Sequence, residues 1–413
     1  MSYRGTKISC YTGYITQAII NNLAPILFII FQKDFGFSFS QLGSLVLINF
    51  GAQIATDIIS AFTIEKMGYR LSAVLAHLFA WIGLAGLGIL PFLFENHFAG
   101  MVIAIVIYAM GSGLIEVLIS PVVEALPSDD KASSMSLLHS FYCWGQLLVV
   151  LVSTLFLKVF GMGTWKILPV MWAIIPFVNM FAFMRVPLPE MISEEEKTPY
   201  RKVFLSKNFA ILCIMMLGAG AAELTMSQWA SLFAEKGLGV SKVMGDLLGP
   251  CLFAFFMGLG RVIYGVKGDK INIKTGFVFT SVLCVVCYIV AAVSLNPFIS
   301  LLGCALTGLS VSLMWPGTYS LGAETFPKAG TALFSILALF GDLGCSSGPY
   351  LAGVVSDMAQ KSTKLCELGA LYGMSADSIG LKLGIITAVI YPILMLIGVF
   401  LLKKTNTSKA LKE

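Results

Sequence analysis

The sequence predicts an all-α membrane protein with twelve transmembrane helices in two pseudo-symmetric bundles of six. Three observations predict it: the composition, the number of long apolar runs, and an internal repeat. Of the 413 residues, 57% are apolar and 12% are charged, whereas a soluble domain carries about 25% charged residues. So little polar surface cannot cover a water-soluble globule, which excludes a soluble enzyme, a nucleic-acid-binding domain and a disordered chain.

Twelve apolar runs are long enough to cross a bilayer, which takes about 20 residues of helix. The runs are continuous rather than alternating, which excludes a membrane β-barrel. The first run follows a short basic segment, but it is too long for a signal peptide and lacks a cleavage site, so we expect it to be retained. The runs lie at 8–31, 41–64, 71–93, 99–124, 133–157, 166–185, 208–233, 245–266, 275–294, 298–322, 330–356 and 381–402.

The longest strongly polar stretch divides the chain between the sixth and seventh runs. It contains three prolines and an acidic triplet, as linkers often do. We therefore expect an N-terminal bundle at 1–185, a cytoplasmic linker at 186–207, and a C-terminal bundle with a short tail at 208–413. Nineteen of the 27 lysines and arginines fall on the side of both termini and the linker, which predicts that this side faces the cytoplasm and that the protein lies in the cell membrane.

The two halves repeat each other in one loop. The loop after the second run reads AFTIEKMGYR over 61–70, and the loop after the eighth reads GVKGDKINIK over 265–274. Both follow the pattern small-x-x-x-acid-Lys-x-x-x-basic. Pro121 and Pro316, each near the cytoplasmic end of its run, provide a second match. Parallel repeats about an axis normal to the membrane are the architecture of one large transporter class.

With these features the chain resembles the major facilitator superfamily over essentially its whole length. The loop motif of that superfamily, G-x-x-x-D-[RK]-x-G-R-[RK], is partly kept in the second loop and degenerate in the first, where Ala61, Glu65 and Tyr69 replace Gly, Asp and Arg. The motif joins a close helix approach to a charge latch that can stabilise one gate state. Asp57 and Arg261 precede the two loops by four residues, and we expect them near span ends as gate charges rather than substrate ligands. The predicted gating set is Asp57, Glu65, Lys66, Arg70, Arg261, Asp269 and Lys270.

Three short matches resemble the fucose-permease-like sugar symporters within that superfamily. They are N-N-L at 21–23, E-x-x-x-S-P at 116–121, where the family pattern is E-x-x-x-N-P, and LHSFYxWG at 138–145. The resemblance implies a sugar substrate and a coupling acid at Glu116. One position departs from the pattern: Pro25 stands where proton-coupled members carry an acid. Proton coupling therefore does not carry over directly.

Ionisable side chains within the predicted spans are the first candidates for functional residues. A charge at the bilayer centre costs about 2.5–3.5 kcal/mol by insertion scales, so Glu116, Glu223, Asp342 and His139 should face the bundle interior. We predict Glu116 and Glu223 as proton carriers. The alternative for these groups is a paired structural charge that holds helices together.

Polar and aromatic residues on several spans are predicted to line a substrate cavity. Gln17 and Asn21 share one helix face, and the acid, amide and indole of Glu223, Gln228 and Trp229 could bind sugar hydroxyls and a sugar ring face. The alternative for Trp229 is a place in the outer aromatic belt. The predicted substrate set is Gln17, Asn21, Asn22, His139, Tyr142, Trp144, Gln146, Glu223, Gln228, Trp229 and Asp342.

The sequence therefore predicts a secondary transporter that moves a monosaccharide or related polyol by alternating access, coupled to protons. An uncoupled uniporter or a different coupling ion stays open. The rival is an exporter of amphipathic compounds with a wall built from some of the 30 phenylalanines. A receptor or membrane enzyme is disfavoured, because the chain offers no signalling domain or catalytic constellation. Without a phosphate-binding loop or an H-E-x-x-H motif, we expect no enzyme activity, no cofactor and no metal site. The expected partners are the solute, protons and lipid, around a monomer.

Overall fold

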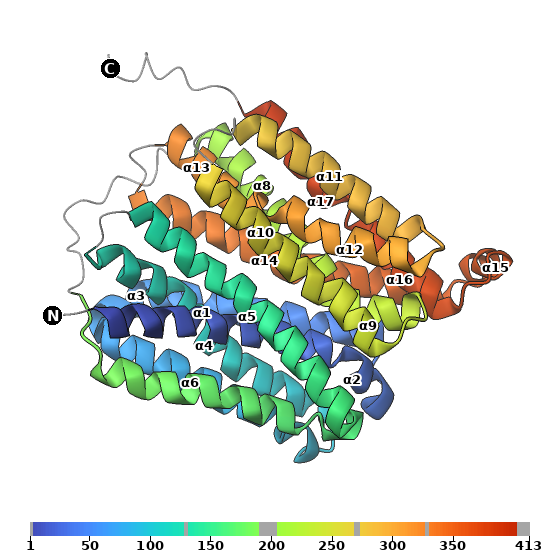
Figure 1. Ribbon diagram of the computed structural model, residues 1–413, viewed down its shortest axis with the longest axis horizontal. Helices are drawn as coiled ribbons and strands as arrows, with labels where there is room; N and C mark the ends of the chain where they lie inside the picture. The colour runs from blue at the N-terminus through green and yellow to red at the C-terminus, as the bar shows by residue number, and fades with distance from the viewer. Residues whose placement is uncertain (1–2, 128–130, 190–204, 268–272, 327–329, 403–413) are drawn as a thin grey trace.

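A computed structural model describes residues 3–127, 131–189, 205–267, 273–326 and 330–402, which are almost entirely helical. The helices run side by side in one elongated bundle (Figure 1). One end of the bundle, here called the terminal end, holds the start of the first helix, α1, and the end of the last helix, α17. The opposite end, here called the far end, holds the turns around α2, α9 and α15.

The first group of helices comprises six main segments. The third, α3, joins the second and third predicted spans without a loop, and the change of direction occurs at Gly68, whose φ of +78° favours glycine. The group consists of α1 (Arg4–Ile26), α2 (Phe28–Phe35), α3 (Phe39–Leu87), α4 (His97–Ala125), α5 (Lys131–Phe160) and α6 (Ile167–Arg185), with short turns η1 (Leu90–Phe92) and η2 (Met162–Thr164).

The second group is more often interrupted along its spans. It consists of α8 (Lys207–Leu232), η4 (Phe233–Gly237), α9 (Lys242–Asp246), η5 (Leu247–Cys251), α10 (Leu252–Lys267), α11 (Ile273–Val293), α12 (Pro297–Val311), α13 (Met314–Thr325), α14 (Gly330–Lys361), α15 (Thr363–Leu371), α16 (Ala376–Thr387) and α17 (Ile390–Leu401).

The expected all-helical fold is confirmed, and twelve spans are consistent with it. Among the described residues, ten helical segments are long and apolar enough to cross a membrane, and the pair α1 and α2, bent by 45°, makes eleven. The 32-residue α14 is long enough to be the twelfth. Two details differ from the sequence prediction. The first span is longer than predicted and is bent after Pro25. In addition, the short helix α15 at the far end was not predicted from any apolar run.

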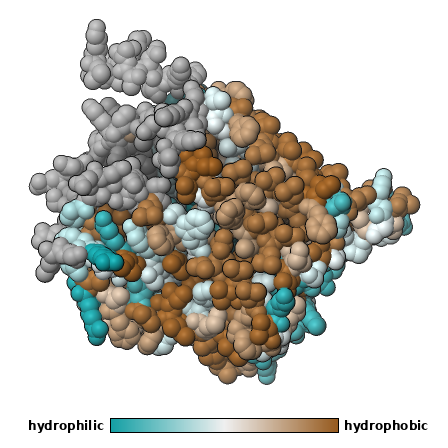
Figure 2. Space-filling model, viewed as in Figure 1, coloured by the Kyte–Doolittle hydropathy of each residue, from teal (hydrophilic) through white to brown (hydrophobic). Residues whose placement is uncertain are grey.

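Glycine lets the helices within each group lie unusually close. A Cβ on Gly111 would lie 2.5 Å from the carbonyl oxygen of Ala76, and one on Gly220 would lie 2.1 Å from that of Gly341. Small residues drive such packing in membranes, where lipid removes the hydrophobic advantage of burying large side chains. The outer surface is accordingly apolar over much of its length (Figure 2).

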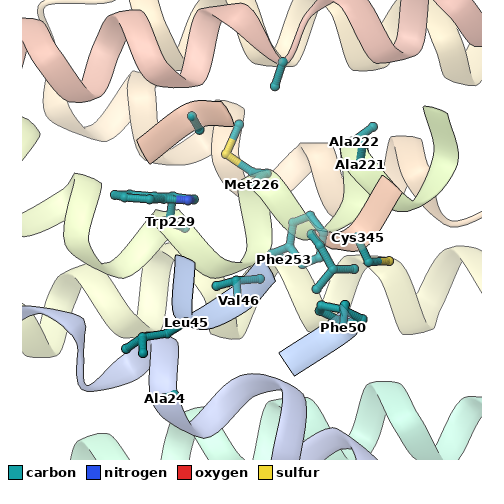
Figure 3. Close-up of a cluster of buried hydrophobic side chains, with 14 of the residues drawn as sticks. Ala24, Leu45, Val46, Phe50, Ala221, Ala222, Met226, Trp229, Phe253 and Cys345 are labelled. Atoms are coloured by element: carbon teal, nitrogen blue, oxygen red, sulfur yellow. The ribbon is translucent and has the colours of Figure 1, made fainter. Parts of the chain in front are cut away.

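The two groups meet chiefly where α3 packs on α14 and α5 packs on α10. Toward the far end the α3 and α14 backbones nearly touch, since a Cβ on Gly353 would lie 2.6 Å from the Phe39 carbonyl oxygen. Figure 3 shows the apolar part of this interface, with Leu45, Val46 and Phe50 of the first group beside Met226 and Trp229 of the second. The polar residues discussed next are buried at the same interface.

Candidate functional site

A network of buried amides lies on the first group's side of the interface. The Asn21 side-chain oxygen accepts hydrogen bonds from Asn49 and Gln53, each at 3.0 Å. The Gln53 oxygen in turn accepts a hydrogen bond of 2.8 Å from the Ser112 hydroxyl. Sequence reasoning predicted Asn21 and missed Asn49 and Gln53, although their four-residue spacing on one face of an apolar run was a usable signal.

Pro25 creates a hydrogen-bond acceptor for the second group. A proline has no N–H to give to the carbonyl four residues earlier, and here that carbonyl belongs to Asn21. The Gln228 amide of α8 donates to it at 3.2 Å. One residue after Pro25, the Ile26 carbonyl at the α1 break accepts from the Lys242 ammonium at 2.8 Å. The residue that departs from the symporter pattern thus leaves the Asn21 carbonyl to a side chain of the opposite group, and the helix break one residue later does the same for the Ile26 carbonyl.

Several predicted substrate residues converge on the same place. The Gln146 amide of α5 donates to the Ser227 hydroxyl of α8 at 2.6 Å, and the Asn22 amide donates to the Tyr142 hydroxyl at 3.4 Å. A cavity of about 10 Å³ lies between Asn22, Pro25, Ile26, Val150, Ser227, Gln228, Ser231 and Pro250. This volume suits one water molecule, so in this conformation the two groups close on each other.

Glu223 and Arg261 form a buried ion pair within the second group. The guanidinium lies 3.2 Å from the Glu223 carboxylate, and its other terminal nitrogen donates to the Cys143 sulfur of α5 at 3.3 Å. Arg261 lies three residues before the end of the span Lys242–Tyr264, as expected, but its guanidinium does not reach toward the membrane surface. Its long side chain turns inward, because a buried carboxylate stabilises a charge that would otherwise seek the membrane surface.

Three carboxyl groups form what we call the acid cluster: Asp57 of α3, Glu116 of α4 and Asp342 of α14. One oxygen from each lies within 4.8 Å of the others. The Gln17 amide donates to Glu116 at 2.9 Å, whereas the buried Asp57 Oδ1 and Asp342 Oδ2 have no hydrogen-bond partner among the described residues. Asp57 lies three residues before the end of the span Phe39–Ser60, as expected, and its carboxylate faces the other two acids.

A second ion pair, unpredicted from the sequence, links the groups near the far end. Lys242 lies 3.1 Å from Asp246, which also accepts a 2.7 Å hydrogen bond from the Thr154 hydroxyl of α5. An acid and a base four residues apart on a helix were a readable signal. The pair, with the Lys242 bond to α1 described above, closes the far end between the groups.

Asp357 of α14 closes the far end at a separate point. Its two carboxylate oxygens accept from the backbone N–H groups of Phe39 at 3.0 Å and Ser40 at 2.7 Å, and from the Ser40 hydroxyl. These N–H groups belong to the first turn of α3, where helix N–H groups lack intrahelical partners and favour negative charge. A side chain of the second group thereby caps a helix of the first.

The aromatic predictions have mixed outcomes. Trp229 is 1% exposed, its indole N–H donates to the Pro349 carbonyl at 3.0 Å, and its ring meets Phe28 and Phe39 edge-on. It is thus an interior residue and not part of an outer belt. His139 packs edge-on against Tyr14. Trp144 is 37% exposed, whereas Gln146 is 2% exposed, and the Trp144 ring lies beside Gly258 of α10.

The predicted gating residues at the loops are only partly described. Lys66 is exposed. The Arg70 guanidinium donates to the carbonyls of Phe183, Met184 and Val186 at 2.6–3.0 Å, around the end of α6, a favourable place for a cation. Asp269 and Lys270 lie outside the described residues, as does the side chain of Glu65.

Comparisons with known proteins agree with this architecture. The family model of the Major Facilitator Superfamily matches residues 10–349, and no curated protein sequence matches the chain significantly. Similar folds include a bacterial homologue of the human lysosomal transporter Spinster, inward-facing and occupied (TM-score 0.76, 13% identity, 99% of this chain and 98% of that chain). A D-xylose–proton symporter (0.75, 16%, 98% and 98%) and the E. coli fucose–proton symporter (0.63, 14%, 98% and 100%) are similar as well. At these identities the likeness establishes the fold, as the sequence resemblance predicted.

Proposed function

Because the chain belongs to the Major Facilitator Superfamily, and is thus a multi-pass membrane transporter and not an enzyme, we propose that it carries a monosaccharide or related polyol. Transport proceeds by alternating access of the two helix groups, coupled to protons. The protein lies in the cytoplasmic membrane as a monomer, with both termini in the cytoplasm, as the distribution of lysine and arginine indicates.

The observation that carries this proposal is a set of buried polar atoms without partners at the interface. Among the described residues these include Gln228 Oε1 and Arg261 Nε. An unsatisfied buried polar atom costs about 1–3 kcal/mol, and a hydroxyl can both donate and accept. A polyhydroxylated solute satisfies such a mixture of acceptors and donors better than an amphipathic compound would, which favours a sugar over the exporter alternative.

The same interface supplies replaceable hydrogen bonds. The Gln146–Ser227 and Gln228–Asn21 bonds join the two groups, so they must break when the groups separate. A solute hydroxyl can take the place of either partner. Binding of the solute then offsets the loss of the closed interface, which is how a ligand selects among transporter conformations.

Glu116 is the proposed proton carrier. It lies in the acid cluster, where three neighbouring carboxyl groups cannot all ionise cheaply, and its helix belongs to the first group while Asp342 belongs to the second. Separation of the groups changes the surroundings of every member. Glu223 is proposed to assist through its ion pair, since Arg261 also contacts Cys143 of the first group.

A thermal-shift screen of the purified protein against sugars, polyols, nucleosides, organic acids and hydrophobic cations tests the substrate class. A ligand that binds only the folded protein raises its melting temperature. We expect a sugar or polyol to do so, and to enter proteoliposomes at least tenfold more slowly with Gln228→Ala. Trp81→Phe, whose ring packs on Phe177 within the first group, is the control and should transport normally. Stabilisation by hydrophobic cations alone would refute the proposal.

Proton coupling is tested in the same vesicles loaded with a pH-sensitive dye. Addition of the solute outside should acidify the lumen with the wild type, and Glu116→Gln should abolish acidification while solute exchange continues. Solute entry in the wild type without any proton movement would show that the carrier is a uniporter or uses another ion.

A further inference from the structure

We propose that Asp57, Glu116 and Asp342 bind a hard metal cation that joins the two helix groups. The inference deepens the proposed transport function by giving the acid cluster a second occupant, in competition with protons. Carboxylate oxygens are the ligands that such cations prefer. Spacing along the sequence gave no sign of this site, because each ligand comes from a different helix.

The geometry of the acid cluster suits one cation. The three carboxylate oxygens all lie within 4.8 Å of one another. A cation such as Ca²⁺ contacts oxygen at about 2.3–2.6 Å, so two ligands on opposite sides of it stand about 4.6–5.2 Å apart. The helices therefore need not move for all three carboxylates to reach a shared ion.

An independent observation comes from the second group. Asp342 is 3% exposed and its Oδ2 has no hydrogen-bond partner among the described residues, although one oxygen of this carboxylate lies within 4.8 Å of the two acids of the first group. A buried carboxylate normally has a hydrogen-bond donor or a cation beside it. Asp57 Oδ1 is buried and unpartnered in the same way. Each side of the interface thus contributes a carboxylate oxygen that has no hydrogen-bond donor or cation beside it among the described residues.

The two buried ion pairs described above use their basic groups to balance other acids. Arg261 pairs with Glu223, and Lys242 pairs with Asp246. Both pairs lie outside the acid cluster. Among the described residues, the Gln17 amide donates a hydrogen bond to Glu116. Neither of these described pairs balances the charge of the acid cluster, and a cation from solution would do so.

The packing around Asp57 leaves room for its carboxylate. A Cβ on Gly113 of α4 would lie 2.7 Å from Asp57 Oδ1, so the absence of a side chain at 113 lets this oxygen approach the α4 backbone. On the other side, the Trp315 ring covers Gly341, next to Asp342, where a Cβ would lie 2.3 Å from the ring. An indole this close to a ligand residue gives the site a fluorescent reporter.

Radioactive cation binding to the purified wild-type protein tests the inference. Binding of ²²Na⁺ and ⁴⁵Ca²⁺ is measured by scintillation proximity, with Li⁺, K⁺ and Mg²⁺ as unlabelled competitors and choline as the inert cation. We expect one ion per chain, at least tenfold weaker binding for Asp342→Asn and for Asp57→Asn, and wild-type binding for Asp377→Asn, at the start of α16. Trp315 fluorescence should change with the same cation, and this change should vanish in Trp315→Phe.

The outcomes separate this inference from the proposed function. Binding of neither cation, with melting temperatures equal in sodium, calcium and choline chloride, would overturn the metal site and leave a proton-only cluster. If Asp342→Asn and Asp57→Asn each bind the cation as tightly as the wild type, the ion lies elsewhere, and the proposed metal site is likewise overturned. Neither result affects the thermal-shift test for the solute, and a missing solute response leaves the ion measurement valid.

Discussion

Two carboxylate regions on one interface differ in how their charge is balanced. Glu223 has an arginine from its own helix group at 3.2 Å, whereas no ion pair with a described cation is seen for Asp57, Glu116 and Asp342, which lie beside one another. The first region carries its counter-charge permanently. The second has no such described counter-charge, so in the proposed mechanism the acid cluster has the main role in coupling and Glu223 assists through its ion pair.

The largest expected effect comes from breaking the permanent pair. Glu223→Ala leaves the Arg261 guanidinium buried without its carboxylate, which should destabilise the protein by about 3–5 kcal/mol. The double variant Glu223→Ala/Arg261→Met removes both charges and should recover most of that loss. Melting temperatures measured without solute or metal check this, and a single variant as stable as the wild type would show that the pair carries no such role.

A neutral replacement in the acid cluster should act in the opposite direction. Glu116→Gln removes one of three neighbouring carboxylates, so mutual repulsion falls and thermal stability should stay equal or rise by about 1 kcal/mol. The melting temperature of Glu116→Gln, compared in one buffer with that of Glu223→Gln, checks the contrast. A large loss of stability with Glu116→Gln would mean that this carboxylate also is permanently paired.

The far end provides a smaller effect. Asp357→Ala removes acceptors from the first turn of α3, a loss comparable to an N-cap at about 1 kcal/mol, and weakens only the closed state. We expect a cysteine introduced at Gly43, which packs against α14, to react faster with a water-soluble maleimide in this variant. Unchanged labelling would show that Asp357 does not hold the far end closed.

The smallest expected effect concerns Pro25. Pro25→Ala restores a backbone N–H that can bond to the Asn21 carbonyl. The Gln228 amide then has to share this acceptor with the helix backbone. A net hydrogen bond contributes about 0.5–1.5 kcal/mol, so solute affinity should change no more than about tenfold. Affinity in the double variant Pro25→Ala/Gln228→Ala decides the mechanism: additive effects would indicate that the two positions act separately.

Much of the fold was predictable because lipid imposes it. The length of each apolar run, the polar linker and the repeated loop all follow from the need to bury backbone groups in helices. The bend at Pro25 was also readable, since proline lacks a donor. The short helix α15 was not, because a helix of that length depends on its contacts more than on its composition.

The sequence predicted which types of residue lie in the candidate site better than it predicted which residues pair with each other. Acids and amides within spans had to face inward, and Glu116, Gln17 and Asn21 do. The greater exposure of Trp144 than of Gln146 was predictable, because two residues along a helix turn by about 200° and so set it opposite Tyr142 and Gln146. The pairing of Glu223 with Arg261, and the meeting of three acids from three helices, depend on how helices are arranged in space, which one sequence does not specify.

The most direct test of the contrast between the two regions compares accumulation with exchange in proteoliposomes. For the solute found by thermal shift, Glu116→Gln should exchange labelled for unlabelled solute across the membrane at a rate near that of the wild type, yet should fail to concentrate it under an imposed proton or cation gradient. Accumulation by Glu116→Gln equal to that of the wild type would contradict the assignment of coupling to the acid cluster.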